Sequence, residues 1–219
     1  MSDTPLRIAV FASGSGSNLE AILQAIENGS LTNISVVAVI SNKSSARALQ
    51  RASSRGIPAV RLSPNTFANE ADYLAALSKV LKKEAVNFIV LAGYLKKIPL
   101  QLVSEFRGRM LNIHPSLLPA FGGPGMYGIK IHKAVLDRGV RWTGVTIHFV
   151  DEHYDTGPIL LQKPVPVHTT DTAEDIAKRV LEVEHRIYPE ALRLFAEGRV
   201  KIEGRKVIID PLASRTEGQ

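Results

Sequence analysis

The chain has 219 residues, of which 45% are hydrophobic and 22% are charged, so its composition is that of an ordinary globular protein rather than a disordered or collagen-like one. It contains no cysteine, which excludes disulfides, thiolate nucleophiles and cysteine-ligated metal centres. The formal net charge of +6 favours anionic partners, but no dense run of lysine and arginine points to a nucleic acid. The apolar runs are far shorter than the roughly 18 residues of a membrane span, and the N-terminus shows no secretory signal. We therefore expect a cytoplasmic protein that binds neither membranes nor nucleic acids.

Strand-like and helix-like segments alternate along the first hundred residues. Short apolar runs bounded by glycine or proline predict buried strands, and apolar residues at helical spacing predict helices between them. In chain order, we expect strands at 6–12, 34–41, 59–62 and 87–92, and helices at 18–27, 46–55 and 69–83. This alternation predicts an open, doubly wound α/β fold with a mostly parallel sheet and helices on both faces.

The second half of the chain continues with longer loops. We expect helices at 100–106, 131–137 and 172–196, strands at 110–114, 143–150 and 159–167, and a terminal hairpin at 200–209 that turns at Gly204 and Arg205. Pro189 should bend or interrupt the last helix, because proline cannot donate a backbone hydrogen bond. No internal repeat or linker is visible, so the pattern predicts one domain.

A loop rich in serine and glycine, residues 13–18, joins the first predicted strand to the first helix. Glycines let the backbone approach a ligand closely, and a helix start offers free N–H groups, so the loop suits a phosphate. A dinucleotide site fits less well, because Leu19 replaces the third glycine of that motif and residues 41–43 lack the acidic side chain that holds a ribose. A Walker-type loop does not fit either, because it needs Gly-Lys-Ser/Thr and residues 13–18 contain no lysine. We favour a monophosphate site over a purely structural glycine turn.

The segment from Asn112 to Pro115 is a second candidate site. On a strand, Asn112 and His114 point to the same face, and Pro115 ends the strand directly after them. The pair should therefore lie at the carboxyl end of the strand, where open α/β sheets carry their ligand crevices. An amide beside an imidazole suits stabilisation of a developing oxyanion and transfer of a proton. The alternative is a strand-end histidine that bonds only to the backbone.

An acidic loop at 151–155 follows a predicted strand, and the turn at 156–158 could direct Asp155 back toward the crevice. A carboxylate beside His114 would raise the pKa of its imidazole and favour the charged form. A solvated loop is one alternative. A metal site made of His114, His148 and Asp155 is another by ligand type, but no helical His-x-x-x-His spacing supports it, so we expect no metal.

Together, these segments resemble the folate-dependent formyltransferases. The resemblance runs from Ile8 to about Phe195 and rests on residues 11–18, 91–94, 112–119, 148–151 and 155–158, with Glu184-His185 before Tyr188-Pro189. It implies a Rossmann-like formyltransferase fold in a single domain at 1–219, with a phosphate-binding half at 1–100, a catalytic and folate-binding half at 101–198, and a terminal hairpin and tail at 199–219. It also implies transfer of the formyl group of 10-formyltetrahydrofolate to the amine of glycinamide ribonucleotide in purine biosynthesis, without a metal.

The resemblance also assigns roles to individual residues. Asn112, His114 and Asp155 would be the catalytic trio, in which Asn112 and protonated His114 stabilise the oxyanion while Asp155 raises the pKa of His114 and aids proton transfer. Gly16, Ser17 and Asn18 would hold the phosphate, and Glu184 would contact the glycinamide end. The folate pocket would be lined by Leu95, Lys96, Lys97 and Ile98, and completed by Arg109, Asp151, Glu152, His153 and Tyr154.

Two features depart from the family pattern. The loop at 121–128 is longer and richer in glycine than in many members, which leaves its geometry and role open. Glu70 stands where some members carry an arginine for the folate, so we assign no folate contact at that position.

Several alternatives share parts of the pattern. Formyltetrahydrofolate hydrolases and formyltransferases that act on transfer RNA or sugar nucleotides share the fold, but they carry extra terminal domains for which we expect no room here. A non-catalytic phospho-ligand sensor would need the loop at 13–18 but not the catalytic trio. We expect small-molecule substrates as partners and a monomer or homodimer.

Overall fold

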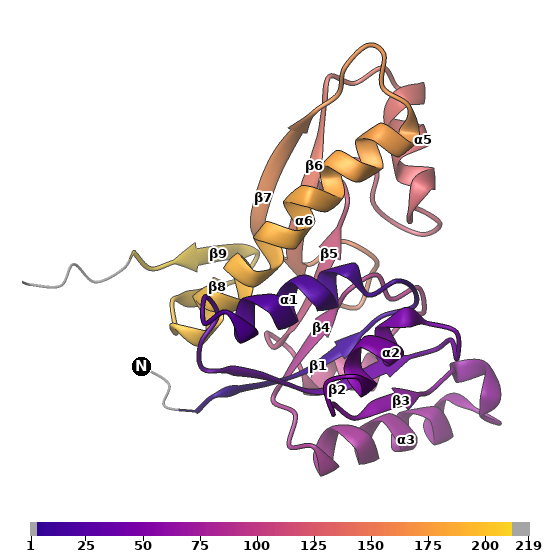
Figure 1. Ribbon diagram of the computed structural model, residues 1–219, viewed down its shortest axis with the longest axis vertical. Coiled ribbons are helices and arrows are strands. Elements are labelled where there is room, and N and C mark those ends of the chain that lie inside the picture. The colour runs from indigo at the N-terminus through magenta and orange to yellow at the C-terminus, as the bar shows by residue number, and fades with distance from the viewer. Residues whose placement is uncertain (1–3, 212–219) are drawn as a thin grey trace, which may run out of the picture.

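The computed structural model describes residues 4–211, and its centre is a seven-stranded sheet with the strand order β3-β2-β1-β4-β5-β6-β7 (Figure 1). Neighbouring strands from β3 to β5 are parallel, whereas β6 runs antiparallel to both β5 and β7. A separate antiparallel hairpin, β8 and β9, follows the sheet in the sequence. The strands are β1 Leu6–Phe11, β2 Ile34–Ser41, β3 Ala59–Arg61, β4 Phe88–Leu91, β5 Met110–His114, β6 Trp142–Phe149, β7 Ile159–Pro166, β8 Val200–Glu203 and β9 Lys206–Ile209.

Side chains alternate between the two faces of the sheet and build two hydrophobic cores. In β1, Ile8 and Val10 belong to one core, while Ala9 and Phe11 belong to the other. All four side chains are fully buried. A strand that is buried on both faces must be covered by helices on both sides, which is the doubly wound arrangement that the sequence predicts.

The helices divide between these two cores. Helices α1, α2, α5 and α6 contribute to the core that contains Ile8, and α3 and α4 contribute to the core that contains Ala9. In Figure 1 the long helix α6 lies across β6 and β7, which it contacts. The helices are α1 Ser17–Glu27, α2 Arg47–Ser53, α3 Glu70–Lys83, α4 Leu100–Glu105, α5 Ile129–Asp137 and α6 Ala173–Ala196, with a short 3-10 turn, η1, at Pro64–Thr66.

Every expected helix and strand is present, and the ends differ from expectation by one or two residues. Of the expected bend or interruption, the interruption is absent, because α6 continues through Pro189. Packing outweighs the lost hydrogen bond there: Ile187, Ala191 and Leu192 on either side of the proline are buried in the core. The expected tail falls partly at 212–219, outside the described residues, as do the first three residues of the N-terminal segment.

The pairing of β5 with β6 sets up the candidate site. Asn112 on β5 stands opposite His148 on β6, and His114 stands opposite Thr146. Side chains of directly opposed residues on one face lie close together. The sheet therefore brings together residues that are far apart in the sequence.

In the described part of the chain, none of the helices is long and apolar enough to span a membrane.

Candidate functional site

Four polar side chains meet over β5 and β6: Asn112, His114, His148 and Asp155. Nδ2 of Asn112 lies 3.1 Å from Nε2 of His148. Asp155 reaches back from the loop after β6, with Oδ2 3.5 Å from Nδ1 of His114 and Oδ1 3.6 Å from Nε2 of His148. Both histidines are almost completely buried. The structure thus brings the expected trio together and adds His148, which we name with them the catalytic cluster.

The surroundings of His114 determine its protonation. Its Nε2 lies 2.9 Å from the carbonyl oxygen of Phe121. A carbonyl can only accept, so the neutral ring carries its proton on Nε2 and turns an unprotonated Nδ1 toward Asp155. Burial lowers the pKa of His114, and the carboxylate of Asp155 and the Phe121 carbonyl raise it by a smaller amount. Asp155 acts in the expected direction, but desolvation outweighs it and leaves the pKa of His114 below its ordinary value, so the neutral form is favoured at neutral pH.

Asp155 provides the negative charge of the cluster. Its backbone lies in the left-handed region, with φ of +58°, which is uncommon for a residue other than glycine. The N–H of Gly123 donates to Oδ2 at 2.9 Å. Burial raises the pKa of Asp155, but the contacts with His148, His114 and Gly123 together outweigh burial and leave the pKa below its ordinary value. Asp155 is consequently ionised at neutral pH beside a neutral His114.

The glycine-rich loop at 121–128 forms one wall of the catalytic cluster. It supplies both the Phe121 carbonyl that faces His114 and the Gly123 N–H that binds Asp155. A Cβ atom at Gly122 would lie only 2.6 Å from Cδ2 of Leu118 and 3.4 Å from Cβ of Asp155. A side chain at position 122 would therefore displace the end of the Leu118 side chain beside Asp155.

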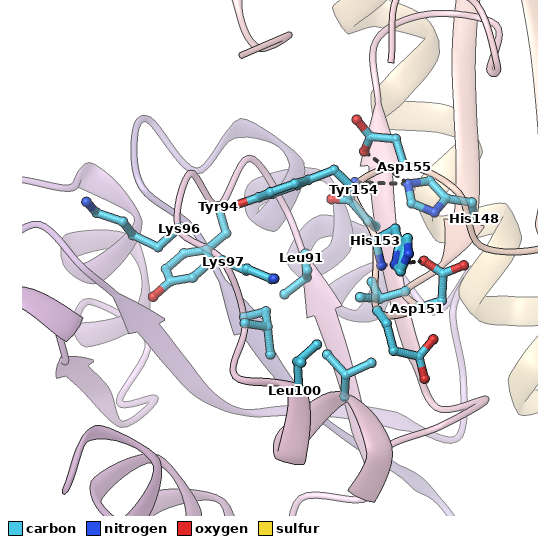
Figure 2. A pocket seen from close by; sticks show the side chains of 15 residues that line it. Leu91, Tyr94, Lys96, Lys97, Leu100, His148, Asp151, His153, Tyr154 and Asp155 are labelled. Carbon is cyan, nitrogen blue, oxygen red and sulfur yellow. Dashed lines mark hydrogen bonds and ion pairs between the residues drawn. The ribbon is translucent and has the colours of Figure 1, made fainter. Parts of the chain in front are cut away.

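A cavity opens beside the catalytic cluster, between the loop that follows β4 and the loop that follows β6 (Figure 2). In Figure 2, His148 and Asp155 lie at one side of the cavity and Lys96 lies at the opposite side. Apolar side chains from β4 and α4 form much of the wall, which suits a largely apolar ligand with an anionic end. The lining residues are Leu91, Tyr94, Lys96, Lys97, Ile98, Leu100, Val103, Asn112, His148, Val150, Asp151, Glu152, His153, Tyr154 and Asp155.

Most of the residues expected to line the folate pocket line this cavity, with two exceptions. Leu95 is not part of the lining, although the residues on both sides of it are. Arg109 does not reach the cavity either, because it precedes β5 and its guanidinium donates to the carbonyl oxygens of Asn87 and Glu105. The apolar residues Leu91, Leu100, Val103 and Val150 were missed, since their sequence pattern is that of ordinary core residues.

The loop after β6 is held by a hydrogen bond within the loop and by contacts with residues outside it. The hydroxyl of Thr156 donates to the carboxylate of Asp151 at 2.8 Å. Glu152 forms an ion pair with Arg107, which follows α4. Arg205, in the turn of the terminal hairpin, donates to the carbonyl oxygen of Thr156 at 2.8 Å. Residues before and after the loop in the sequence thus fix the segment that carries Asp155.

The loop at 13–18, which we call the phosphate loop, enters α1 through a strained turn. Gly16 has φ of +68°, and a Cβ atom there would lie 2.8 Å from both Cα and Cβ of Ala48. No side chain caps the start of α1. The first backbone N–H groups of a helix have no partner within the helix, so this uncapped start can bind an anion.

Asn18 links the phosphate loop to α6. Its Nδ2 donates to Oε2 of Glu184 at 2.7 Å, and both side chains are buried. Burial raises the pKa of Glu184, and the bond from Asn18 lowers it by a smaller amount. The Oδ1 atom of Asn18 is buried and has no hydrogen-bond partner within the described residues. The structure therefore brings Glu184 on α6 next to the last residue of the loop at 13–18.

The metal alternative has no geometric support between residues 4 and 211. This part of the chain holds no group of three or more histidine, cysteine, aspartate or glutamate side chains that could bind a metal ion.

Comparison with known proteins connects this geometry to a family. Residues 6–192 match the formyl transferase family. A phosphoribosylglycinamide formyltransferase of Arabidopsis thaliana, described as chloroplastic, is 50% identical over 197 residues; the match covers 89% of this chain and 67% of that protein. The crystal structure of glycinamide ribonucleotide transformylase 1 from Symbiobacterium toebii is 43% identical, with a TM-score of 0.89 and 96% of each chain covered. A formyltetrahydrofolate deformylase from Pseudomonas syringae pv. tomato is 28% identical, with a TM-score of 0.84, 96% of this chain and 67% of that chain covered.

Proposed function

The chain belongs to the formyl transferase family, and we propose that it transfers the formyl group of 10-formyltetrahydrofolate to the amine of glycinamide ribonucleotide in purine biosynthesis. One observation carries the proposal: Asn112 and Asp155 line a cavity, and the buried His114 lies against Asp155, in a chain that also presents the loop at 13–18. Identity of 50% to a phosphoribosylglycinamide formyltransferase supports this substrate over others of the family.

The ribonucleotide binds at the start of α1. Backbone N–H groups at Gly16, Ser17 and Asn18 hold its phosphate at the positive end of the helix. Glu184 contacts the glycinamide end, and its bond from Asn18 fixes the carboxyl group relative to the phosphate loop. The phosphate and the glycinamide end are thereby held at a set distance from each other.

The folate binds in the cavity of Figure 2. Residues Leu95 to Ile98 and the loop residues Asp151 to Tyr154 contact it, largely through backbone groups. The ammonium groups of Lys96 and Lys97 attract its glutamate tail. Arg109 lies outside the cavity lining, and its guanidinium donates to the carbonyl oxygens of Asn87 and Glu105, so a contact between Arg109 and the folate would require this side chain to move.

The reaction starts when the neutral amine attacks the formyl carbon. A C–N bond forms, and the carbonyl electron pair moves to the oxygen of a tetrahedral intermediate. One N–H of the Asn112 amide faces His148, which leaves the second to donate to this oxyanion. His114 accepts the proton that the attacking amine loses, and the charge of Asp155 stabilises the imidazolium. The bond to N10 of the folate then breaks, the carbonyl forms again, and His114 returns the proton to N10. No step requires a metal.

The test is formyl transfer by the purified protein, followed as the absorbance change of 10-formyltetrahydrofolate with and without glycinamide ribonucleotide. We expect turnover only when the ribonucleotide is present. Equal turnover without it would identify a hydrolase, the activity named for the Pseudomonas syringae protein. The absence of turnover in both conditions would favour a phospho-ligand sensor.

A further inference from the structure

Ser13 lies at the junction of the two regions that the proposed function assigns to different substrates. It follows β1, opens the phosphate loop and exposes only 3% of its surface. In the sheet, β1 lies between β2 and β4. Since all three strands are parallel, the loops that follow them leave the same edge of the sheet. Ser13 therefore stands between the loop after β2 and the loop after β4.

Three hydrogen bonds connect Ser13 to those two loops. Its backbone N–H donates to the carbonyl oxygen of Gly93 at 3.1 Å. Its hydroxyl accepts a bond from the N–H of Leu95 at 2.9 Å and donates to Oδ1 of Asn42 at 2.6 Å. A hydroxyl has one hydrogen and two lone pairs, so a single group makes both bonds. Leu95 begins the segment 95–98, whose remaining residues line the cavity of Figure 2.

The rest of the phosphate loop is attached to α2. The carbonyl oxygen of Gly14 accepts from the N–H of Ala48 at 3.3 Å, and that of Ser15 accepts from Nε of Arg51 at 2.9 Å. Gly16 approaches Ala48 so closely that no Cβ atom fits between them. The loop is therefore held at successive residues, and a change in its position at Gly16 is transmitted to Ser13.

From these contacts we infer that Ser13 is a positioning residue that couples the ribonucleotide site to the folate site. The inference rests on the proposed function. When a phosphate orders the phosphate loop, the Ser13 hydroxyl is ordered with it, and the bond from Leu95 then orders the segment 95–98. The segment 95–98 is then already ordered when the folate binds, so folate binding loses less conformational entropy. Each ligand therefore tightens the binding of the other. Without the hydroxyl, the N–H of Leu95 and Oδ1 of Asn42 lose their hydrogen bonds to Ser13, and only the backbone hydrogen bond to Gly93 still joins Ser13 to the loop after β4.

The experiment compares Ser13→Ala with a matched control, Thr143→Val. Thr143 on β6 also has a buried hydroxyl, but its Oγ1 has no hydrogen-bond partner in the described part of the chain, and neither site includes it. Titration calorimetry measures the affinity for glycinamide ribonucleotide with and without saturating tetrahydrofolate, which lacks the formyl group and cannot react. In the wild type and in Thr143→Val, we expect tetrahydrofolate to tighten ribonucleotide binding by about fivefold or more. In Ser13→Ala, this factor should fall well below the wild-type value, toward one, although each ligand still binds alone.

Linkage requires the ribonucleotide to change tetrahydrofolate affinity by the same factor, which checks the measurement. A wild-type factor of one, or an unchanged factor in Ser13→Ala, would overturn the inference. If Ser13→Ala shows no cooperative thermal transition, Asn42→Ala replaces it, because that variant frees the Ser13 hydroxyl to rotate but keeps its acceptor role. We then expect a factor below that of the wild type, and an equal factor overturns the inference. Failure of the proposed function itself appears differently, as a wild-type protein that transfers no formyl group.

Discussion

The phosphate loop and the catalytic cluster are built in opposite ways. The phosphate loop is one continuous segment that offers mainly backbone groups, shaped by the left-handed turn at Gly16. The catalytic cluster collects side chains from β5, β6 and the loop after β6, and the loop at 121–128 supplies two further contacts. A backbone site depends on a local conformation, whereas a side-chain site depends on the packing of several distant segments.

The two regions also differ in their electrostatics. The phosphate loop offers the partial positive charge of an uncapped helix start, which suits the phosphate of the proposed substrate. The catalytic cluster holds an ionised Asp155 beside a buried, neutral His114. Burial strengthens the interaction between them and favours the unprotonated ring, the form that the proposed mechanism needs in a proton acceptor. We therefore expect mutations to separate ribonucleotide binding at the phosphate loop from proton transfer at the catalytic cluster.

The largest expected effect gives the clearest test of the separation between the phosphate loop and the catalytic cluster. His114→Ala removes the proton acceptor and should lower kcat by about 10³. Affinity for glycinamide ribonucleotide, measured by calorimetry, should stay within about twofold of the wild type, because His114 makes no contact with the phosphate loop. A loss of affinity comparable to the loss of rate would mean that His114 acts through the structure and that the two regions are not independent.

The same contrast explains what the sequence could predict. The conformation of the loop at 13–18 follows from a local signal, alternating serine and glycine at a strand-to-helix junction, whereas its phosphate ligand stays a prediction. Hydrophobic periodicity also predicts the strands and helices. It does not predict that α6 continues through Pro189, because the packing that stabilises the helix there is a tertiary contact. Asn112 and His114 were found together because they are two residues apart on one strand.

The catalytic cluster could be predicted only in part. The role of His148 depends on the register between β5 and β6, which places it opposite Asn112 and which no local pattern encodes. The neutral state of His114 depends on burial outweighing the attraction of Asp155, a balance that needs coordinates. Arg109 was assigned to the folate by resemblance, yet its local backbone partners hold it elsewhere.

A smaller effect tests the electrostatics within the catalytic cluster. Asp155→Asn removes the negative charge while keeping the size of the side chain, and should lower kcat by about 10². Because a nearby carboxylate favours the imidazolium, its loss should lower the pKa of His114 further below the value in the wild type. Titration of the His114 ring by nuclear magnetic resonance measures this shift directly.

The pH dependence of the rate provides a second measurement on the same variant. A base must be unprotonated, so wild-type kcat should fall as the pH drops through the pKa of His114, which lies below the ordinary histidine value of about 6.5. In Asp155→Asn this acidic limb should move to lower pH even though the maximum rate is reduced. A limb that stays in place or moves to higher pH would contradict the coupling between the two groups. The affinity of Asp155→Asn for glycinamide ribonucleotide should equal that of the wild type, although its maximum rate and its acidic limb have changed.

The smallest effect concerns the phosphate loop alone. Gly16→Ala places a Cβ atom against Ala48 at a residue with positive φ, so the turn into α1 must distort. We expect the KM for glycinamide ribonucleotide to rise by about tenfold while kcat changes little, because the loss is one of binding common to the ground and transition states. Gly14→Ala is the matched control, since a Cβ atom at Gly14 would meet nothing within 4 Å and Gly14 is not among the glycines with positive φ. If both alanine variants raised KM equally, the loop would be sensitive to any side chain, and the left-handed turn at Gly16 would not be what shapes the phosphate site. If Gly16→Ala instead lowered kcat as strongly as KM rose, the distortion at the phosphate loop would also have altered the catalytic cluster. That result would contradict the independence of the two regions.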